Sequence, residues 1–168
     1  KPGFNMISIP ATPSDSDINS IISSTSPIDF VMTYDNATGL WLVATRDPDT
    51  GLLVGNLSTI DAAHSYWVQS DRFLDLSFSI PRSSAGLPVF PTIIEVFTGW
   101  NVVPVGDPLQ QAAGTAIAAN TYFAGLTWSA AYTFDPTTNN FTKVVAGDNV
   151  LVGSGYFLYV TKDGVIIP

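Results

Sequence analysis

The sequence contains no cysteine, which excludes disulfide frameworks, thiol catalysis and zinc sites built on cysteine. Basic residues are scarce as well, since 6 Lys and Arg stand against 14 Asp and Glu and give a formal net charge of −8. A surface that binds nucleic acid or an anionic membrane needs clustered Lys and Arg, so we expect neither partner. No apolar run approaches the roughly 18 residues of a membrane-spanning helix, so we expect no membrane insertion.

Charge of either sign is low, at 12% of the residues, whereas hydrophobic residues make up 46%. An intrinsically disordered chain would show the opposite balance. Glu95 is the only glutamate, and the other charged helix formers that usually face solvent are also few. Thr, Val, Ile and aromatic residues, which favour strands, are abundant instead. The composition therefore predicts a mainly β fold with little helix.

Four short segments of the first half of the chain recur in the same order in the second half. They are residues 3–10 at 99–105, 34–41 at 134–141, 65–68 at 155–158, and 78–81 at 165–168. The first pair is a Gly-aromatic-Asn turn before an apolar strand, the second is typical of a hairpin, and the others indicate strands. Such repetition indicates an internal duplication. We predict two tandem, pseudo-symmetric β-rich lobes of sandwich or barrel type, each with at most one short helix.

The same repeats suggest the domain boundaries. We expect a first β-rich repeat over residues 1–81, a linker over 82–95 and a second repeat over 96–168. A flexible linker is normally polar, but this one contains Leu, Val and Phe, so we expect it to dock against a repeat.

One short helix is expected in each copy. In the first, residues 17–22 carry isoleucines at helical spacing, with Ser14 or Ser16 as the N-cap. In the second, a helical turn is expected at 108–113, and 117–123 fits either a helix or a strand.

The apolar and aromatic residues on the strands predict one core for each lobe. The first is expected to contain Ile7, Ile9, Tyr34 and Trp67, and the second Val103, Val105, Phe134 and Phe157. Aromatic side chains can also stack sugar rings, and in that alternative the platform is formed by Trp41, Trp67, Trp100 and Trp128, with Tyr34, Tyr66 and Tyr156. Because aromatic positions recur in both copies, packing is the preferred interpretation.

The sequence offers few residues for catalysis. His64 is the only histidine, so a His-Glu-x-x-His zinc site is impossible, and no Gly-x-Ser-x-Gly segment is present. Most aspartates fall in turn-rich segments, where their side chains bond to nearby backbone N–H groups. We therefore predict no catalytic residues and no enzyme.

Two motifs suggest a metal ion or a modification. Asp47 and Asp49 form an Asp-x-Asp-x-Gly segment, but Ser58 stands where an EF-hand loop needs glutamate. A loop tip is the preferred interpretation, a calcium site of another type at these two aspartates is the alternative, and no other cofactor is expected. The N-glycosylation sequon occurs three times, with acceptors Asn36, Asn56 and Asn140.

The Gly-aromatic-Asn strand, the Tyr-centred hairpin and the later Gly-Tyr-Trp strand together resemble a repeat of secreted surface proteins of bacteria and archaea. The resemblance covers both halves, and this sequence departs from the family pattern at Phe4, Ser65 and Phe157, where that repeat has Trp, Gly and Trp. The resemblance implies a non-catalytic module of extracellular or cell-surface structures.

The duplication, the low charge and the missing catalytic groups predict a structural or assembly module of an extracellular or particle structure, such as a surface layer, a filament or a virion. It is expected to associate with copies of itself or other structural subunits through apolar faces and strand edges. The alternative is a carbohydrate-binding or adhesive module of a larger secreted protein, with glycans as partners. The expected location is extracellular, on a cell surface or in a virion.

Overall fold

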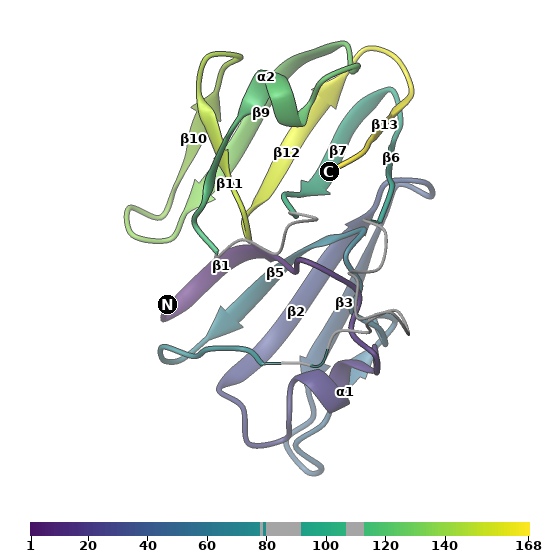
Figure 1. Cartoon of the computed structure of the whole chain (residues 1–168). Helices are drawn as coiled ribbons and strands as arrows, with labels where there is room; N and C mark the ends of the chain where they lie inside the picture. Colours follow the sequence, from purple (N-terminus) through teal and green to yellow (C-terminus); the bar gives the residue numbers. More distant parts are fainter. Residues whose placement is uncertain (78, 80–91, 107–112) are drawn as a thin grey trace, which may run out of the picture.

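The computed structural model describes residues 1–77, 79, 92–106 and 113–168 of the chain (Figure 1). The protein is mainly β, with 47% strand and 5% helix, as predicted. We call residues 1–77 the first lobe and the described residues from 92 to 168 the second lobe. The first lobe contains β1 (Gly3–Ser8), α1 (Ile18–Ile21), β2 (Ile28–Asp35), β3 (Leu40–Arg46), β4 (Leu53–Gly55) and β5 (Ser65–Ser70). The second contains β6 (Ile94–Val96), β7 (Gly99–Pro104), β8 (Ala116–Ala118), α2 (Ala119–Tyr122), β9 (Trp128–Asp135), β10 (Asn140–Val144), β11 (Asn149–Leu151), β12 (Gly155–Val160) and β13 (Gly164–Ile166).

Both lobes are built on an antiparallel sheet with the same strand order. The order is β1-β5-β2-β3-β4 in the first lobe and, read from β7, β7-β12-β9-β10 in the second. Two small ladders, β8 with β11 and β6 with β13, complete the second lobe. The repeated order confirms the predicted pair of pseudo-symmetric lobes, and no sheet of the described residues closes into a barrel.

The strand register is repeated as well. Gly3 pairs with Ser70 across β1 and β5, and Gly99 pairs with Val160 across β7 and β12. Residue numbers of corresponding positions thus differ by 96 between β1 and β7 and by 90 between β5 and β12. They differ by 100 between the β2–β3 and β9–β10 hairpins, which turn at equivalent places. Both sheets also carry a β-bulge at the second residue of the hairpin's first strand, which is β2 in the first lobe and β9 in the second.

The Gly-aromatic-Asn motif opens the first strand of each sheet through the same contacts. Gly3 and Gly99 have φ of 86° and 112°, a region that residues with a Cβ rarely adopt. The side-chain amides of Asn5 and Asn101 each donate to the backbone carbonyls two and four residues earlier. These local bonds explain why the motif occurs once per lobe.

Each lobe contains one four-residue helix, as expected. The N-cap of α1 is Asp17, whose carboxylate accepts from the N–H groups of Asn19 and Ser20, so the expected serine cap is wrong. The serines stand one and three residues too early to reach these orphan donors. In the second lobe, the stretch 117–123, whose sequence fits either a helix or a strand, contains the end of β8 and the whole of α2. The turn expected at 108–113 lies outside the described residues except for Ala113.

One face of each sheet packs against the helix and loops of its own lobe. The predictions for Ile7 and Ile9 and for Val103 and Val105 are confirmed, since these residues lie in or against the two lobe cores. The prediction for the aromatic residues is wrong, because a third cluster forms between the lobes. It consists of buried Met6, Trp67 and Val102 with partly buried Met32, Tyr34, Phe134 and Phe157.

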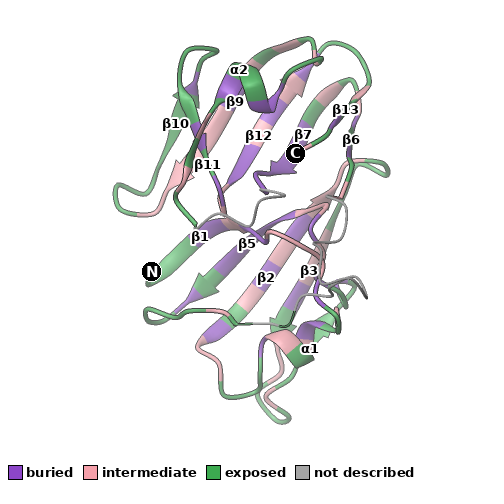
Figure 2. Ribbon diagram, in the orientation of Figure 1, coloured by how far each residue is buried: buried purple, intermediate pink, exposed green. Residues whose placement is uncertain are grey.

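Strand alternation explains this third cluster. On β5, Tyr66 and Val68 face the first lobe's core, so Trp67 between them points to the opposite face of the sheet. That face is apolar too, and it packs against the corresponding face of the second sheet. Buried residues therefore occur on strands of both lobes where these meet (Figure 2).

The lobes are in close contact at the start of β12. A Cβ placed on Gly155 would lie 2.7 Å from the Oγ of Ser65 and 2.8 Å from the Cγ of Met6, so only glycine fits there. Close by, the Ser8 N–H donates to the Gly153 carbonyl at 2.9 Å, and its hydroxyl donates to the Val105 carbonyl at 2.9 Å. Backbone bonds thus join the two lobes.

The predicted linker over 82–95 is described only from residue 92. β6 begins at Ile94 and pairs with β13, so the end of this segment belongs to the second lobe's sheet structure. Residues 82–91, and three of the four residues in the repeat segment 78–81, lie outside the described part. Within the described part, no helix is long and apolar enough to cross a membrane.

Candidate functional site

An open cleft of about 620 Å³ lies between the β2–β3 hairpin of the first lobe and the sheet of the second. Its lining is almost entirely aromatic: Tyr34, Trp41, Trp100, Val102, Tyr132, Phe141 and Phe157. The volume is in the range of pockets that hold small ligands.

Strand pairing brings these residues together. Tyr34 and Trp41 face each other across the β2–β3 hairpin, with ring centroids 5.1 Å apart. On β7, Trp100 and Val102 are two residues apart and so point to the same face of the sheet. The ring of Trp100 contacts that of Tyr132 on β9 at 6.1 Å. The cleft is therefore set by two rigid sheets.

The hairpin is held in place by Asn36 at its tip. The side-chain amide of Asn36 donates to the Val102 carbonyl at 3.2 Å and accepts from the Val102 N–H at 2.9 Å. These two bonds pair the hairpin with the open edge of β7, directly beside the cleft. The distance between the two walls of the cleft depends on this contact.

The exposed rings present flat apolar surfaces with polar edges. Exposed fractions are 41% for Trp41 and 49% for Trp100, which is high for side chains of this size. The indole N–H groups of both residues, and the hydroxyls of Tyr34 and Tyr132, have no hydrogen-bond partner among the described residues. They are therefore available to hydroxyl groups of a ligand.

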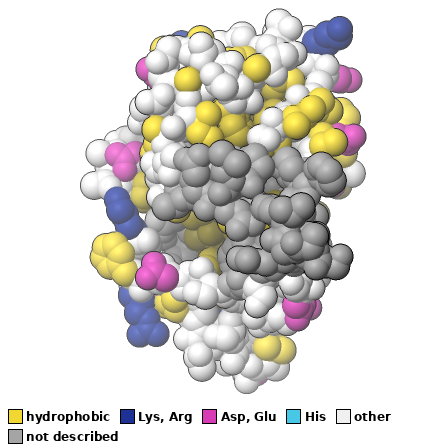
Figure 3. Space-filling model, in the orientation of Figure 1, with side chains coloured by type: hydrophobic (Ala, Val, Ile, Leu, Met, Phe, Trp, Pro, Cys, Tyr) yellow, Lys and Arg dark blue, Asp and Glu magenta, His cyan; other side chains and the backbone are white. Residues whose placement is uncertain are grey.

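No described lining residue is charged. Charged side chains of both signs are few on the face of the molecule shown in Figure 3, where hydrophobic and uncharged polar groups cover most of the described surface. Because the chain carries a net charge of −8, an anionic ligand would in addition be repelled over longer range. The cleft thus suits a neutral ligand with flat apolar faces and polar edges.

Of the four tryptophans predicted as a sugar platform, the structure brings two into the cleft, Trp41 and Trp100. Trp67 lies between the lobes and is only 7% exposed, so it cannot stack a ligand. Trp128 is half-buried at the edge of the second lobe's core, where its ring contacts Phe123. The structure therefore does not bring these two tryptophans into the cleft.

Four other lining residues were not predicted as part of a site: Val102, Tyr132, Phe141 and Phe157. Phe141 faces Phe134 across the β9–β10 hairpin, and this hairpin had been recognised. The strand pairing would have identified two of them, because Tyr132 and Phe157 are cross-strand partners and therefore lie on the same face of the sheet.

Asp47 has a local structural role. Its Oδ1 accepts from the N–H groups of Asp49 at 2.8 Å and Thr50 at 2.9 Å, and these bonds hold the pKa of Asp47 below its usual value. This is the turn chemistry of a loop tip. In the part of the chain that the structure describes, no three or more His, Cys, Asp or Glu side chains gather into a potential metal site. Calcium binding at Asp47 and Asp49 stays a prediction.

The three glycosylation acceptors differ in their surroundings. Asn36 is half-buried and engaged by β7, as described above. The Asn56 side chain is exposed and accepts from the Val43 N–H, and that of Asn140 is exposed and donates to the Thr138 carbonyl. Modification of these two stays a prediction, while a glycan on Asn36 would compete with the contact between the lobes.

His64 forms the one histidine–carboxylate pair of the chain. Its Nδ1 lies 2.7 Å from the Oδ1 of Asp61, and this hydrogen bond raises the pKa of His64. Burial works to raise the pKa of Asp61, but the hydrogen bond and the charge of His64 outweigh it, so that pKa is lowered. No serine or threonine hydroxyl of the described residues bonds to His64.

Comparisons with models of known protein families, with curated proteins and with solved structures found no match for this chain.

Proposed function

We propose that this chain is a non-enzymatic module that binds a neutral glycan in the cleft between its lobes. The observation that carries the proposal is the uncharged lining of six aromatic side chains and one valine. Hexopyranose rings have faces covered by C–H groups, and these faces pack well on aromatic rings. Their hydroxyl groups lie around the ring edge, where the free indole N–H and tyrosine hydroxyl groups of the cleft can bond to them.

The proposal contains no catalytic step. Glycoside hydrolysis needs two carboxyl groups about 5 to 10 Å apart on either side of the sugar, and no carboxylate is among the described residues that line the cleft. The His64–Asp61 pair precedes β5 and lies outside the lining residues. Binding, rather than turnover, is the chemistry that these side chains support.

A role in an extracellular, cell-surface or particle structure fits this activity, since an adhesive module there would attach to polysaccharide. Self-association is the second candidate function, because the edge strands of the two main sheets, β1, β4, β7 and β10, each pair with one strand only. Of these, β7 is also bonded by Asn36, and β1 is bonded to Gly153 through Ser8. β4 has only 3 residues and β10 carries the exposed Lys143, and both features discourage addition of a further strand. Glycan binding is therefore the better supported of the two.

A glycan array carrying neutral and acidic polysaccharides tests the proposal. We expect binding to one or more neutral hexose polymers, and at least a tenfold loss of affinity for Trp100→Ala. Phe4→Ala is the matched control, because Phe4 occupies the position of Trp100 in the other lobe, is 42% exposed and lies outside the cleft. Absence of binding to every glycan, or equal binding by Trp100→Ala, would contradict the proposal.

A further inference from the structure

We infer that the cleft is open because Phe157 stands where the first lobe has the larger Trp67. The pseudo-symmetry of the lobes repeats the residues of the cleft at a second place, where Trp67 fills the space. The chain therefore carries one glycan site, the open copy, and one filled equivalent, the closed copy. The inference rests on the proposed function for the nature of the ligand. The shape of the cleft does not depend on that function, and the two are tested separately below.

The repeated strand register defines the closed copy. Six of the seven residues that line the open cleft have a counterpart in the closed copy at the offsets given above. The seventh, Phe141, is itself the counterpart of Trp41 and lies at the border of both copies. The counterparts of Tyr34, Trp41, Trp100, Val102, Tyr132 and Phe157 are, in the same order, Phe134, Phe141, Phe4, Met6, Met32 and Trp67.

In the closed copy, the indole of Trp67 fills the space between these counterparts. Its centroid lies 4.8 Å from Phe134, 6.0 Å from Phe141 and 6.3 Å from Phe4. Met6 and Met32 complete the enclosure in the cluster between the lobes. One large ring thus joins the hairpin of the second lobe to the sheet of the first.

In the open copy, Phe157 does not reach the equivalent partners. Among the described residues it makes no ring contact with Tyr34, Trp41 or Trp100, and its ring contacts are with Trp67 at 6.4 Å and Phe141 at 5.7 Å. A phenyl ring is shorter than an indole, so the space between the hairpin of the first lobe and the sheet of the second stays empty. That space is the cleft.

The closed copy also indicates what the open copy binds. A planar two-ring group fits between the two walls, and the Nε1–H of Trp67 is buried there without a hydrogen-bond partner. The closed copy is therefore an apolar slot. The rim of the open copy carries free N–H and hydroxyl groups instead, so it fits a ring with apolar C–H faces and polar substituents at its edge, as a pyranose has.

Two exchanges between the lobes test this inference. Phe157→Trp copies the closed lobe, and Trp67→Phe copies the open one. Titration with Nile red, a neutral apolar dye, reports each cleft without any assumption about its natural ligand. We expect one dye site in the wild type, at least tenfold weaker binding to Phe157→Trp, and a second site of similar affinity in Trp67→Phe.

Unchanged dye binding by a folded Phe157→Trp protein, or a single dye site in Trp67→Phe, would overturn the inference. If Phe157→Trp does not fold, the number of sites in Trp67→Phe alone decides. Titration of the same proteins with cellotetraose, maltotetraose and mannotetraose separates the two proposals. Dye sites that change as expected without any sugar binding would contradict the proposed function alone. Sugar binding that is equal in the wild type and Phe157→Trp would contradict the inference alone.

Discussion

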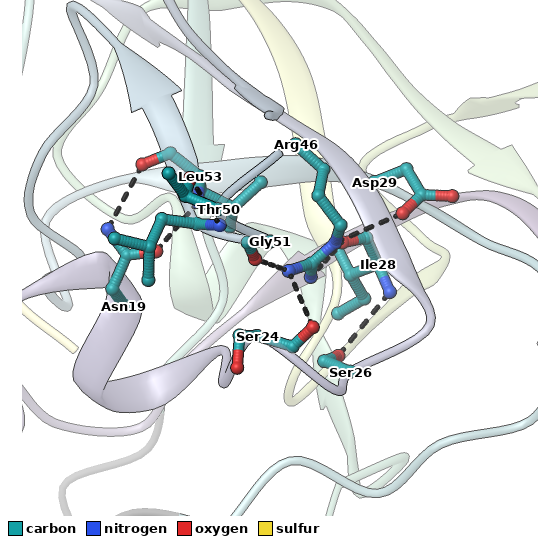
Figure 4. A network of polar contacts seen from close by, with 10 residues as sticks. Asn19, Ser24, Ser26, Ile28, Asp29, Arg46, Thr50, Gly51 and Leu53 are labelled. Atoms are coloured by element: carbon teal, nitrogen blue, oxygen red, sulfur yellow. Dashed lines mark hydrogen bonds and ion pairs between the residues drawn. The ribbon is translucent and has the colours of Figure 1, made fainter. Parts of the chain in front are cut away.

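The two lobes share a backbone plan, yet they differ at the base of the long hairpin. In the first lobe, Arg46 at the end of β3 reaches back across the hairpin (Figure 4). Its guanidinium donates to the backbone carbonyls of Ser24, Ile28 and Gly51, and its Nε lies 3.1 Å from the Oδ1 of Asp29. This one side chain joins β2, β3 and the two adjoining loops.

In the second lobe, Ala146 stands at the corresponding position, and a groove of about 420 Å³ beside Trp128 is left open. Phe157 is likewise smaller than Trp67, its counterpart in the first lobe. At both places the first lobe has a large side chain that closes a gap, and the second lobe has a smaller one that leaves it open. Side-chain size at these two corresponding positions therefore decides which of the matched gaps is closed and which stays open.

The largest effect that we predict concerns the two corresponding aromatic residues. Trp67→Ala should lower the free energy of unfolding by about 3–5 kcal/mol, because it empties the space between the lobes. Phe157→Ala should cost about half as much, because Phe157 is half-buried and borders an existing cleft. Urea denaturation measures both values. Equal losses, or a larger one for Phe157→Ala, would show that the two sites are not open and closed copies.

The next effect concerns Arg46. Arg46→Ala should lower the free energy of unfolding by about 2–3 kcal/mol, because it leaves partly buried carbonyl groups without a donor. Lys143→Ala is the control, since this exposed cation has no hydrogen-bond partner among the described residues and should cost less than about 0.5 kcal/mol. The same denaturation measurement applies. A loss for Arg46→Ala as small as that of the control would remove its role in closing the first lobe.

A smaller effect is expected at the tip of the hairpin. Asn36→Ala removes two hydrogen bonds to Val102 and should cost about 1–2 kcal/mol. Asn140→Ala in the second lobe removes only a bond within its own exposed hairpin and should cost less than about 0.5 kcal/mol. Thermal unfolding of the three proteins provides the ranking. If both variants unfold at the same temperature, the contact between the hairpin and β7 does not hold the lobes together.

The smallest effect is a pH dependence that belongs to the first lobe alone, since Ser154 stands where the first lobe has His64. The raised pKa of His64 means that the pair stabilises the fold below the unfolded histidine pKa of about 6.5. This stabilisation is lost as the pH rises through the folded pKa. At the acid end it is lost as the pH falls through the lowered pKa of Asp61.

Unfolding curves of the wild type and His64→Ala, measured from pH 4 to pH 9, give this dependence. The difference in unfolding free energy between the two proteins should be largest near pH 5 and should shrink toward pH 9. A difference that grows with pH would contradict the assigned pair.

Much of the fold could be predicted from the sequence, because the turns need special residues. Gly3 and Gly99 supply backbone conformations that other residues avoid, and Asp35 and Asp135 cap their hairpin turns through the same bond to the N–H two residues later. Such local chemistry is visible in a sequence, and it fixed the order and the spacing of the repeats.

The cluster between the lobes could not be predicted in the same way. On β5, neighbours Tyr66 and Trp67 are both apolar and both buried, because both faces of the sheet are covered. Alternation therefore shows that two faces exist without showing which face meets the other lobe. The cleft exists because the ring of Phe157 does not reach the opposite hairpin, and this distance is set by how the two lobes pack together.

The most direct test of the account uses the indole N–H signals of the four tryptophans in a nitrogen-15 NMR spectrum. Titration with a neutral oligosaccharide that binds on the glycan array should shift the signals of Trp41 and Trp100 and leave that of Trp128 unchanged. Trp67, enclosed in the closed copy, should shift less than either cleft residue. Unchanged Trp41 and Trp100 signals at saturating ligand, or a largest shift at Trp128, would contradict the assignment of the cleft as the binding site.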